Sequence, residues 1–261
     1  MVKQKISPDV DFARDLISSN RVLVNGALQN NLNSVFDASV QISLTKEAKK
    51  YVSRGGFKLE KALSEFDIDV SGLKALDVGA STGGFTDCLL QHGAAHVIAI
   101  DVGRSQLDEK IRKHENVTIF ERLNAKDLNL EITDGACDIC VIDVSFTSVL
   151  PLLEAITSVL SEDAPFIALI KPQFEGNKDQ VSEDGVITDA QIHIEILEQF
   201  LSSFPKYFKL KALSASPITG AKGNIEFISL FERSGEASSI DIEKIVREAH
   251  ASVNETEANN D

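Results

Sequence analysis

Cysteines are few in this sequence, and long apolar runs are missing. The 261 residues include three cysteines, an odd and low number that indicates a reduced, cytosolic protein rather than a disulfide framework. No apolar stretch approaches the ~20 residues that a membrane span requires. Residues 1–8 also lack the apolar core of a signal peptide. We therefore expect a cytoplasmic protein with no membrane partner.

Positive charge is scarce as well, and its distribution is uneven. The chain has 26 Lys and Arg against 40 Asp and Glu, a formal net charge of −14, which argues against a simple nucleic-acid binder. Residues 1–70, however, hold ten basic against nine acidic residues, whereas the other 191 residues hold 16 against 31. Any nucleic acid should therefore be held by the first quarter of the chain and by a local patch near the active site.

Metal-binding and hydrolase patterns are missing too. The five histidines show no metal-ligand spacing, and no Ser-His-Asp arrangement with a nucleophile elbow occurs. Cys137 and Cys140 form a Cys-x-x-Cys pair, but they fall in an apolar run that we interpret as a strand from Cys137 to Val144. Residues three apart in a strand face opposite sides, so we predict core packing for both cysteines and no metal site.

A glycine loop stands out among the features that are present. The apolar run 75–78 stops at Gly79, a small-residue turn leads to Gly84, and a helical pattern starts at Phe85. A second apolar run, 96–101, ends in Asp101, which lies 22 residues after Gly79. A glycine loop lets backbone approach a ligand, and an acid at this distance can accept hydrogen bonds from ribose hydroxyls. The pattern predicts a nucleoside-binding βαβ unit.

Strand and helix patterns then alternate to residue 231, which predicts an α/β fold with a mostly parallel, Rossmann-like sheet. The last two expected strands, 208–215 and 224–231, are separated by too few residues for a helical crossover and should pair antiparallel. The intervening predictions are strands at 117–121, 137–144 and 165–170, and helices at 106–113, 148–160 and 188–204.

The chain divides into four expected segments. Residues 1–44 form a small αβ module, 45–57 a linker, 58–233 the catalytic domain, and 234–261 an acidic end with a helix over 240–250 and a disordered tail. In the first segment we predict a helix over 9–20, a strand from Arg21 into the Asn25-Gly26 turn, and a strand over 35–44.

Ionisable residues fall where several predicted strands end. Asp143 follows the run 140–142, Lys171 follows 167–170, and Glu226 lies in the last strand, while Lys58 precedes the first. Ligands of open α/β sheets bind at the carboxyl ends of strands, and charges are costly in a core unless paired. Each of these charges alone could be a surface or salt-bridging residue. Together, around a nucleotide-type loop, they indicate an active site.

The sequence resembles the TlyA (hemolysin A) family of FtsJ-like RNA 2′-O-methyltransferases, densely over residues 51–231 and loosely over 12–44. The motifs that carry the resemblance are 51–59, 77–87, Asp101-Val102-Gly103 with Gln106-Leu107, Asp143-Val144-Ser145-Phe146, 171–175, and Ser216-Pro217-Ile218 with 223–227. Residues Arg14–Gly26 resemble the second half of an S4-type RNA-binding domain whose basic first helix is missing. This truncated module could bind RNA weakly, only place the catalytic domain, or serve as a structural cap.

The resemblance implies an S-adenosylmethionine-dependent enzyme that methylates ribosomal RNA, alone or in a ribosomal subunit, with a Lys-Asp-Lys-Glu tetrad at Lys58, Asp143, Lys171 and Glu226. The implied cofactor contacts are Asp77, Gly79, Ala80, Ser81, Gly83, Gly84, Phe85, Asp101, Asn124 and Asp143. From the uneven charge we expect RNA contacts from Arg14, Arg21, Lys49, Lys50 and Arg54. A ribose hydroxyl must lose its proton as the methyl group arrives. We assign Lys171 as the base and Lys58 as the neighbouring cation, with the two acids orienting them.

Three other functions compete with this interpretation. A dehydrogenase of similar topology would need Gly-x-Gly-x-x-Gly, whereas this loop is Gly-x-x-x-Gly-Gly. A membrane-lysing protein, as the family name suggests, would need an apolar span or a basic amphipathic helix, and the C-terminal helix is acidic. An RNA-binding protein that has lost catalysis remains an alternative, although the tetrad residues are intact.

Overall fold

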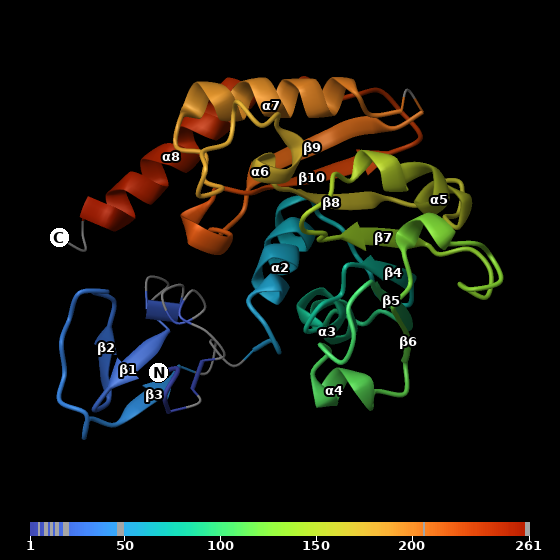
Figure 1. Ribbon diagram of the computed structural model, residues 1–261. Helices are drawn as coiled ribbons and strands as arrows, with labels where there is room; N and C mark the ends of the chain where they lie inside the picture. The colour runs from blue at the N-terminus through green and yellow to red at the C-terminus, as the bar shows by residue number, and fades with distance from the viewer. Residues whose placement is uncertain are drawn as a thin grey trace.

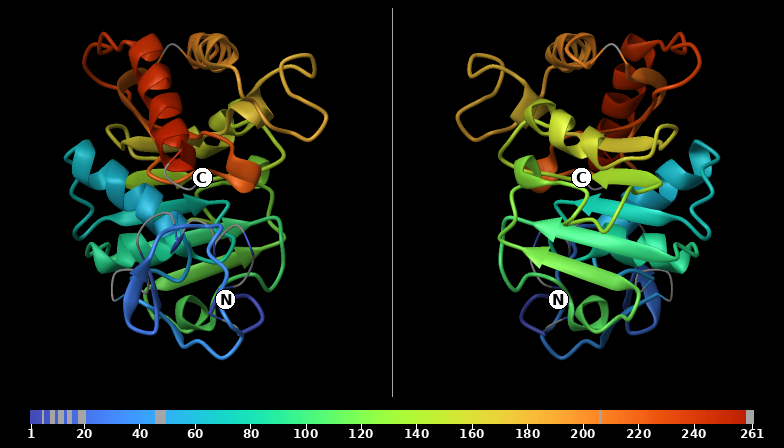
Figure 2. Two further views of the ribbon diagram at one scale, coloured as in Figure 1. Left: turned by 90° about the vertical axis from the view of Figure 1, so that its left-hand side faces the viewer. Right: turned by 90° about the vertical axis from the view of Figure 1, so that its right-hand side faces the viewer.

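A seven-stranded sheet forms the centre of the molecule. The computed structural model describes residues 1–4, 6–7, 10, 13, 16–17, 21–45, 50–205 and 207–258. The strands of the large sheet are β4 (Lys74–Val78), β5 (His96–Asp101), β6 (Val117–Glu121), β7 (Ile139–Ile142), β8 (Phe166–Ile170), β9 (Lys209–Ala215) and β10 (Phe227–Glu232), in the order β6-β5-β4-β7-β8-β10-β9. Figure 2 shows these strands stacked with helices on both faces.

The strand directions confirm the predicted Rossmann-like topology. Strands β6, β5, β4, β7 and β8 run parallel, whereas β10 pairs antiparallel with both β8 and β9. The antiparallel pairing of the last two strands follows the prediction made from their short connection. It also has a consequence for the site, because the start of β10 lies at the same sheet edge as the ends of the parallel strands.

Two helical layers cover the sheet. The helices α2 (Gly55–Glu65) and α3 (Gly84–Gln91) pack together on one face, while α5 (Leu153–Ser158), α7 (Ala190–Ser202) and α8 (Ile242–Ala258) cover the other. The short elements are α4 (Glu109–Arg112), α6 (Pro172–Glu175) and the 3-10 turns η2 (Ala125–Asp127), η3 (Leu150–Leu152) and η4 (Ala221–Gly223). Neighbouring residues of β8, such as Phe166 and Ile167, face opposite layers, which explains why this strand is apolar throughout.

A smaller sheet lies beside the α2–α3 side of the large one (Figure 1). Its strands are β1 (Val22–Val24), β2 (Ala27–Gln29) and β3 (Ile42–Leu44), all antiparallel, in the order β2-β1-β3. The predicted hairpin is confirmed: β1 and β2 pair directly across Asn25-Gly26, and both turn residues have positive φ, 49° and 81°.

The predicted strand over 35–44 is wrong for most of its length, since β3 begins only at Ile42. An Asp37 carboxylate that accepts from the Ser39 N–H, at 2.9 Å, folds the preceding residues into a turn instead. The helix expected over 9–20 falls largely outside the described residues. Of that range, Val10, Ala13, Leu16 and Ile17 are described, and all four are helical.

Two further predictions need correction. Strand β7 begins at Ile139, so Cys137 precedes it, and Cys137 and Cys140 pack in the same core rather than on opposite faces. Both thiols are free and buried. The tail predicted to be disordered is helical to Ala258, because α8 packs on α7 and Val253 contacts the core beyond the expected end at His250.

Candidate active site

The tetrad residues meet at the edge where the parallel strands end. Asp143 directly follows β7, Lys171 directly follows β8, and Glu226 immediately precedes the antiparallel β10. Phe227 pairs with Ile170, so Glu226 and Lys171 leave their two strands at the same level. Lys58 reaches this edge from the first turn of α2. The structure thus brings together all four side chains that sequence reasoning selected.

The four charges form two ion pairs. Lys58 pairs with Glu226, and the Lys171 Nζ lies 2.5 Å from the Asp143 Oδ1. Lys58, Glu226 and Lys171 are almost fully buried, at 4%, 3% and 8% exposed. Lys171 also donates to the Ser145 Oγ at 2.8 Å. Buried charges with their partners removed would be costly, so each lysine is held by its own acid.

Asp143 lies in a field that keeps it ionised. Burial alone would raise the pKa of its carboxyl group, but the cations of Lys171, Lys58 and Arg54 together bring that pKa below its ordinary value. Because Lys58 acts on Asp143 as well as on Glu226, the two ion pairs interact and form one cluster. A cluster of two cations and two anions is neutral as a whole, which allows it to be buried beside a cleft.

The glycine loop lies next to the tetrad. Gly79 has a φ of +84°, and a Cβ at this position would lie 2.5 Å from the Asp143 carbonyl oxygen. Only glycine therefore lets the ends of β4 and β7 approach this closely. Ala80, Ser81, Gly84 and Phe85 continue along the wall of the same cleft as Asp143 and Lys171.

Asp77 lies beneath this loop and is fully buried. Its Oδ2 accepts from the Thr86 hydroxyl at 2.5 Å, which fixes the start of α3 against β4. Its Oδ1 has no hydrogen-bond partner within the described part of the chain. Burial raises the pKa of Asp77 to about 7; Thr86 partly offsets this, and the charges of Asp143 and Asp101 add to it.

The side chain of Asp101 binds the backbone of the glycine loop and of the turn that follows β5. One carboxylate oxygen accepts from the Ser81 N–H at 2.8 Å and the other from the Gly103 N–H at 2.6 Å. Each oxygen keeps a second lone pair that a ribose hydroxyl could use. Asn124 caps the turn η2 by accepting from the Lys126 N–H at 3.0 Å. Asp77, Gly83, Asp101 and Asn124 are not among the residues that line the cleft.

The cleft itself has a volume of about 990 Å³. One rim carries an aromatic pair, Phe146 and Phe174, with ring centroids 5.2 Å apart. Phe146 is 90% exposed and has a φ of +64°, an uncommon conformation for a bulky residue. Asp184, Gly185 and Lys222 also line the cleft.

The expected RNA contacts have different environments. The Arg21 guanidinium lies 5.4 Å from the centre of the Phe57 ring, and Lys50 pairs with Glu60 and lies over Tyr51. Arg54 lines the cleft beside the tetrad. Arg14 and Lys49 lie outside the described residues.

Sequence reasoning did not select Ser145, Phe146 or Phe174 as site residues. All three lie in motifs that carried the family resemblance, Asp143-Val144-Ser145-Phe146 and 171–175, so the signal was present in the sequence. What the sequence could not indicate is that the Ser145 hydroxyl contacts Lys171 and that the two phenylalanine rings meet at the cleft.

These features fit a nucleoside methyl donor. The loop offers a tight backbone cradle at Gly79, and Asp101 retains free lone pairs for hydroxyl groups. Asp143, which lines the cleft and whose pKa is lowered, suits a donor that carries positive charge. A donor bound here would be held by Gly79–Phe85 and Asp101 and would supply an electrophilic methyl group.

Comparison with known proteins gives the same assignment. Residues 51–233 match the family model described as FtsJ-like methyltransferase. Hemolysin A from Brachyspira hyodysenteriae is 42% identical over 221 residues, covering 84% of this chain and 92% of that protein. The 16S/23S rRNA (cytidine-2'-O)-methyltransferase TlyA from Mycobacterium tuberculosis strain H37Rv is 37% identical, covering 87% of this chain and 85% of that one.

A solved structure of a protein from Streptococcus thermophilus superposes with a TM-score of 0.79 at 35% identity, covering 94% of this chain and 92% of that one. The fold and the site define an S-adenosylmethionine-dependent methyltransferase. The chain belongs to the TlyA (hemolysin A) family of FtsJ-like methyltransferases. Among the residues described, no helix combines the length and the apolarity that crossing a bilayer requires.

Proposed function

We propose that this protein methylates the 2′-hydroxyl of a ribose in ribosomal RNA, with S-adenosylmethionine as methyl donor. The observation that carries the proposal is the pair of buried ion pairs, Lys58–Glu226 and Lys171–Asp143, beside the glycine loop. The matched relative from Mycobacterium tuberculosis is named as a cytidine-2'-O-methyltransferase of 16S and 23S rRNA, and this supports both the ribose hydroxyl and the kind of RNA.

In this proposal Lys171 is the general base. Its nitrogen has two polar partners in the described part of the chain, Asp143 and Ser145, which fix its position at the cleft. In its neutral form the amine has two N–H donors, which Asp143 and Ser145 can accept, and one lone pair, which remains to take the hydroxyl proton of the substrate. Lys58 contributes positive charge next to the base, and Glu226 holds Lys58 in place.

The hydroxyl must also be aligned with the incoming methyl group. We assign this positioning to the exposed ring of Phe146, supported by Phe174, as a platform on which the target base stacks. Stacking on an aromatic side chain contributes about 1–3 kcal/mol per base and tolerates any base. Phe146 is exposed, has a strained backbone and lines the same cleft as Lys171, the proposed proton acceptor, which is consistent with such a role.

Phosphate contacts would come from the basic first quarter of the chain, with Arg54 nearest the chemistry. We propose that residues 1–44, with their three-stranded sheet, assist as a truncated S4-like module. In an acidic protein, few lysines and arginines are placed to bind RNA, so each should matter. Arg54→Gln should weaken RNA binding and reduce its salt dependence. Arg247→Gln, in an exposed pair with Glu243 on α8, is the matched control.

The decisive experiment maps 2′-O-methyl groups in ribosomal RNA from cells with and without this protein. The expected result is one or a few ribose sites that lose their methyl group and regain it with the wild-type chain but not with Lys171→Arg. Loss of a base methylation instead of a ribose methylation, or no change in either ribosomal RNA, would overturn the proposal.

A further inference from the structure

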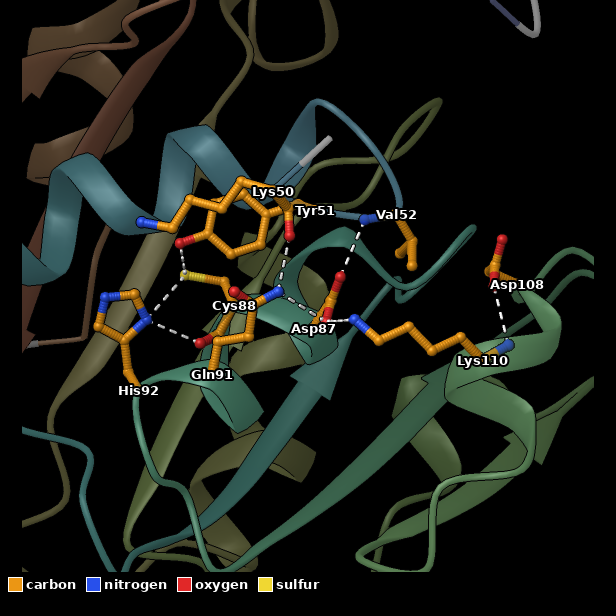
Figure 3. Close-up of polar contacts among 9 residues, drawn as sticks. All are labelled: Lys50, Tyr51, Val52, Asp87, Cys88, Gln91, His92, Asp108 and Lys110. Atoms are coloured by element: carbon orange, nitrogen blue, oxygen red, sulfur yellow. Dashed lines mark hydrogen bonds and ion pairs between the residues drawn. The ribbon is translucent and has the colours of Figure 1, made fainter. Parts of the chain in front are cut away.

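Asp87 is a buried carboxylate that the catalytic scheme does not use. It lies in the first turn of α3, is 1% exposed, and belongs neither to the tetrad nor to the lining of the cleft. Its Oδ2 accepts from the Val52 N–H at 2.9 Å (Figure 3). Its Oδ1 accepts from the Gln91 side chain at 3.0 Å and from the Lys110 Nζ at 2.8 Å. One carboxylate thus has three partners, one on its own helix and two in other parts of the chain.

Gln91 adds a second bond to the same segment. Its Nε2 donates to the Lys50 carbonyl oxygen at 2.7 Å as well as to Asp87. The backbone of residues 50–52 is therefore attached to α3 at two points, one through its carbonyl and one through its N–H (Figure 3). This segment has no strand pairing of its own, so α3 supplies its hydrogen bonds.

Close packing leaves this segment little room to shift. A Cβ on Gly84 would overlap the Ser53 hydroxyl, and a Cβ on Gly56 would overlap the Tyr51 ring. Tyr51 is itself buried between α2 and α3. The backbone of Gly84 therefore lies against the backbone of Gly55 and Gly56 and against the Ser53 hydroxyl. A displacement of one would be transmitted to the other.

The two elements held in this way carry different parts of the site. Residues 53–55 lead directly into α2, which bears Lys58, and Arg54 lines the cleft. Gly84 and Phe85 belong to the glycine loop and begin α3. Through the Asp87–Val52 hydrogen bond, a side chain of α3 holds the segment that leads into α2.

We propose that Asp87 is a positioning residue that couples the glycine loop to the segment carrying Arg54 and Lys58. Its hydrogen bond to the Val52 N–H keeps the start of α2 in register with the start of α3. The exposed Lys110 balances the charge of Asp87 but does not set the geometry, because its side chain is 56% exposed and free to move. The inference rests on the proposed function only for its rate measurement.

Two measurements test the coupling without RNA. In the full-length protein, hydrogen exchange reports the protection of the Val52 amide, and calorimetry reports the Kd of S-adenosylhomocysteine. Asp87→Ala should increase the Val52 exchange rate and weaken ligand binding, each by at least about tenfold, as expected for a lost hydrogen bond to a charged group. Asp87→Asn keeps an oxygen for the Val52 N–H and should stay within about threefold of wild type in both.

Lys110→Met is the matched variant for the ion pair, and it should change either quantity by less than about fivefold. Val52→Pro removes the N–H donor of this hydrogen bond. Adding Asp87→Ala to Val52→Pro should therefore weaken ligand binding little further. At saturating donor, Asp87→Ala should also lower the rate of methyl transfer about tenfold, since Lys58 is displaced.

Several outcomes would overturn the inference. One is a folded Asp87→Ala protein with wild-type Val52 exchange and ligand affinity. Another is Lys110→Met with losses as large as those of Asp87→Ala, which would give the role to the ion pair. If Asp87→Ala does not fold, two other results would contradict the proposal. The first is a Val52 amide that exchanges without protection in the wild type. The second is a loss of ligand affinity in Asp87→Asn as large as that in Val52→Pro. Absence of RNA methylation would contradict only the proposed function, because binding and exchange do not involve RNA.

Discussion

Two places in this molecule bury titratable side chains, and they do so in opposite ways. At the edge where the parallel strands end, two lysines and two acids form the pairs Lys58–Glu226 and Lys171–Asp143. Between α7 and α8, His193 is fully buried with its Nδ1 2.9 Å from the His250 Nε2, and its ring lies against Phe227. Burial, followed by the charge of His250, lowers the pKa of His193 to about 4, and burial lowers that of His250 as well, although Asp189 opposes both shifts.

The difference shows where charge is retained and where it is given up. The histidine pair and the paired charges meet at the start of β10. Phe227, the first residue of β10, contacts His193, and its neighbour Glu226 pairs with Lys58. Keeping an ion buried requires a partner of opposite charge, whereas neutralising it requires only burial. This protein keeps its paired charges beside the cleft, where the proposed reaction would take place, and has a neutral histidine pair in the helical packing.

Breaking one ion pair should give the largest effect on stability. Lys58→Met leaves Glu226 buried without its partner, which should lower the free energy of unfolding by about 3–5 kcal/mol. Lys113→Met is the control, since its exposed pair with Glu109 should contribute less than about 1 kcal/mol. The double variant Lys58→Met/Glu226→Met should regain most of the stability but no activity. Urea unfolding measures the stability of all three variants. An unchanged free energy of unfolding in Lys58→Met would contradict the description of Lys58 and Glu226 as a buried ion pair.

Exchanging the base for a permanent cation should separate charge from chemistry. Lys171→Arg keeps the pair with Asp143, so donor and RNA binding should stay near wild type, but arginine cannot deprotonate in the working range. Methyl transfer should fall at least about a hundredfold, roughly 2.7 kcal/mol, within the range for loss of a general base. Single-turnover methylation from pH 6 to 10 is the measurement. A wild-type rate and pH profile would remove Lys171 from the mechanism.

Asp77 is a buried acid that forms no ion pair with any residue the structure describes. Its folded pKa of about 7 is above the unfolded value, so its contribution to stability is present at low pH and is lost as pH rises to about 7. Asp77→Asn does not ionise, so the variant should gain about 2 kcal/mol relative to wild type between pH 5 and pH 8. Thermal unfolding at several pH values decides this. A constant difference between the two proteins would show that Asp77 is ionised throughout.

The histidine pair should give the smallest effect, with the opposite sign. Its folded pKa values are lowered, so its contribution is present above the unfolded value near 6.5 and is lost as pH falls toward about 4. Wild type should therefore lose about 1 kcal/mol between pH 7 and pH 5.5 that His193→Gln does not lose. His114→Gln, remote from α7 and α8, serves as the control and should retain the wild-type slope. Equal slopes for all three proteins would mean that the buried pair does not titrate with unfolding.

Three of the sequence predictions failed, two for local reasons and one because of a tertiary contact. The strand expected over 35–44 was shortened because an Asx turn at Asp37 competes with pairing. The two cysteines were separated by strand periodicity, but Cys137 lies before the strand, where that periodicity does not apply. The helix α8 runs to Ala258 because its apolar face packs on α7, a contact that the acidic composition of the tail does not reveal.

The sequence by itself determined the architecture and which sheet edge carries the candidate site. Apolar runs alternating with helical patterns require a parallel sheet, the short connection before β10 reverses one strand, and charges that follow apolar strands must meet at one edge. Asp143 and Lys171 could be selected in this way, and the family resemblance implied that they form a tetrad with Lys58 and Glu226. The architecture and the choice of edge follow from periodicity and chain geometry, which are local properties.

Only the tertiary structure decided the partners. That Lys58 pairs with Glu226, 168 positions away, and Lys171 with Asp143 is a matter of side-chain reach across strands and helices. The sequence likewise does not reveal that Asp77 Oδ1 lacks a hydrogen-bond partner among the described residues, or that Asp87 accepts from the Val52 N–H. An aspartate looks the same in a sequence whether it is exposed, paired or isolated. Its energy is set by the atoms around it, and those atoms come together only when the chain has folded.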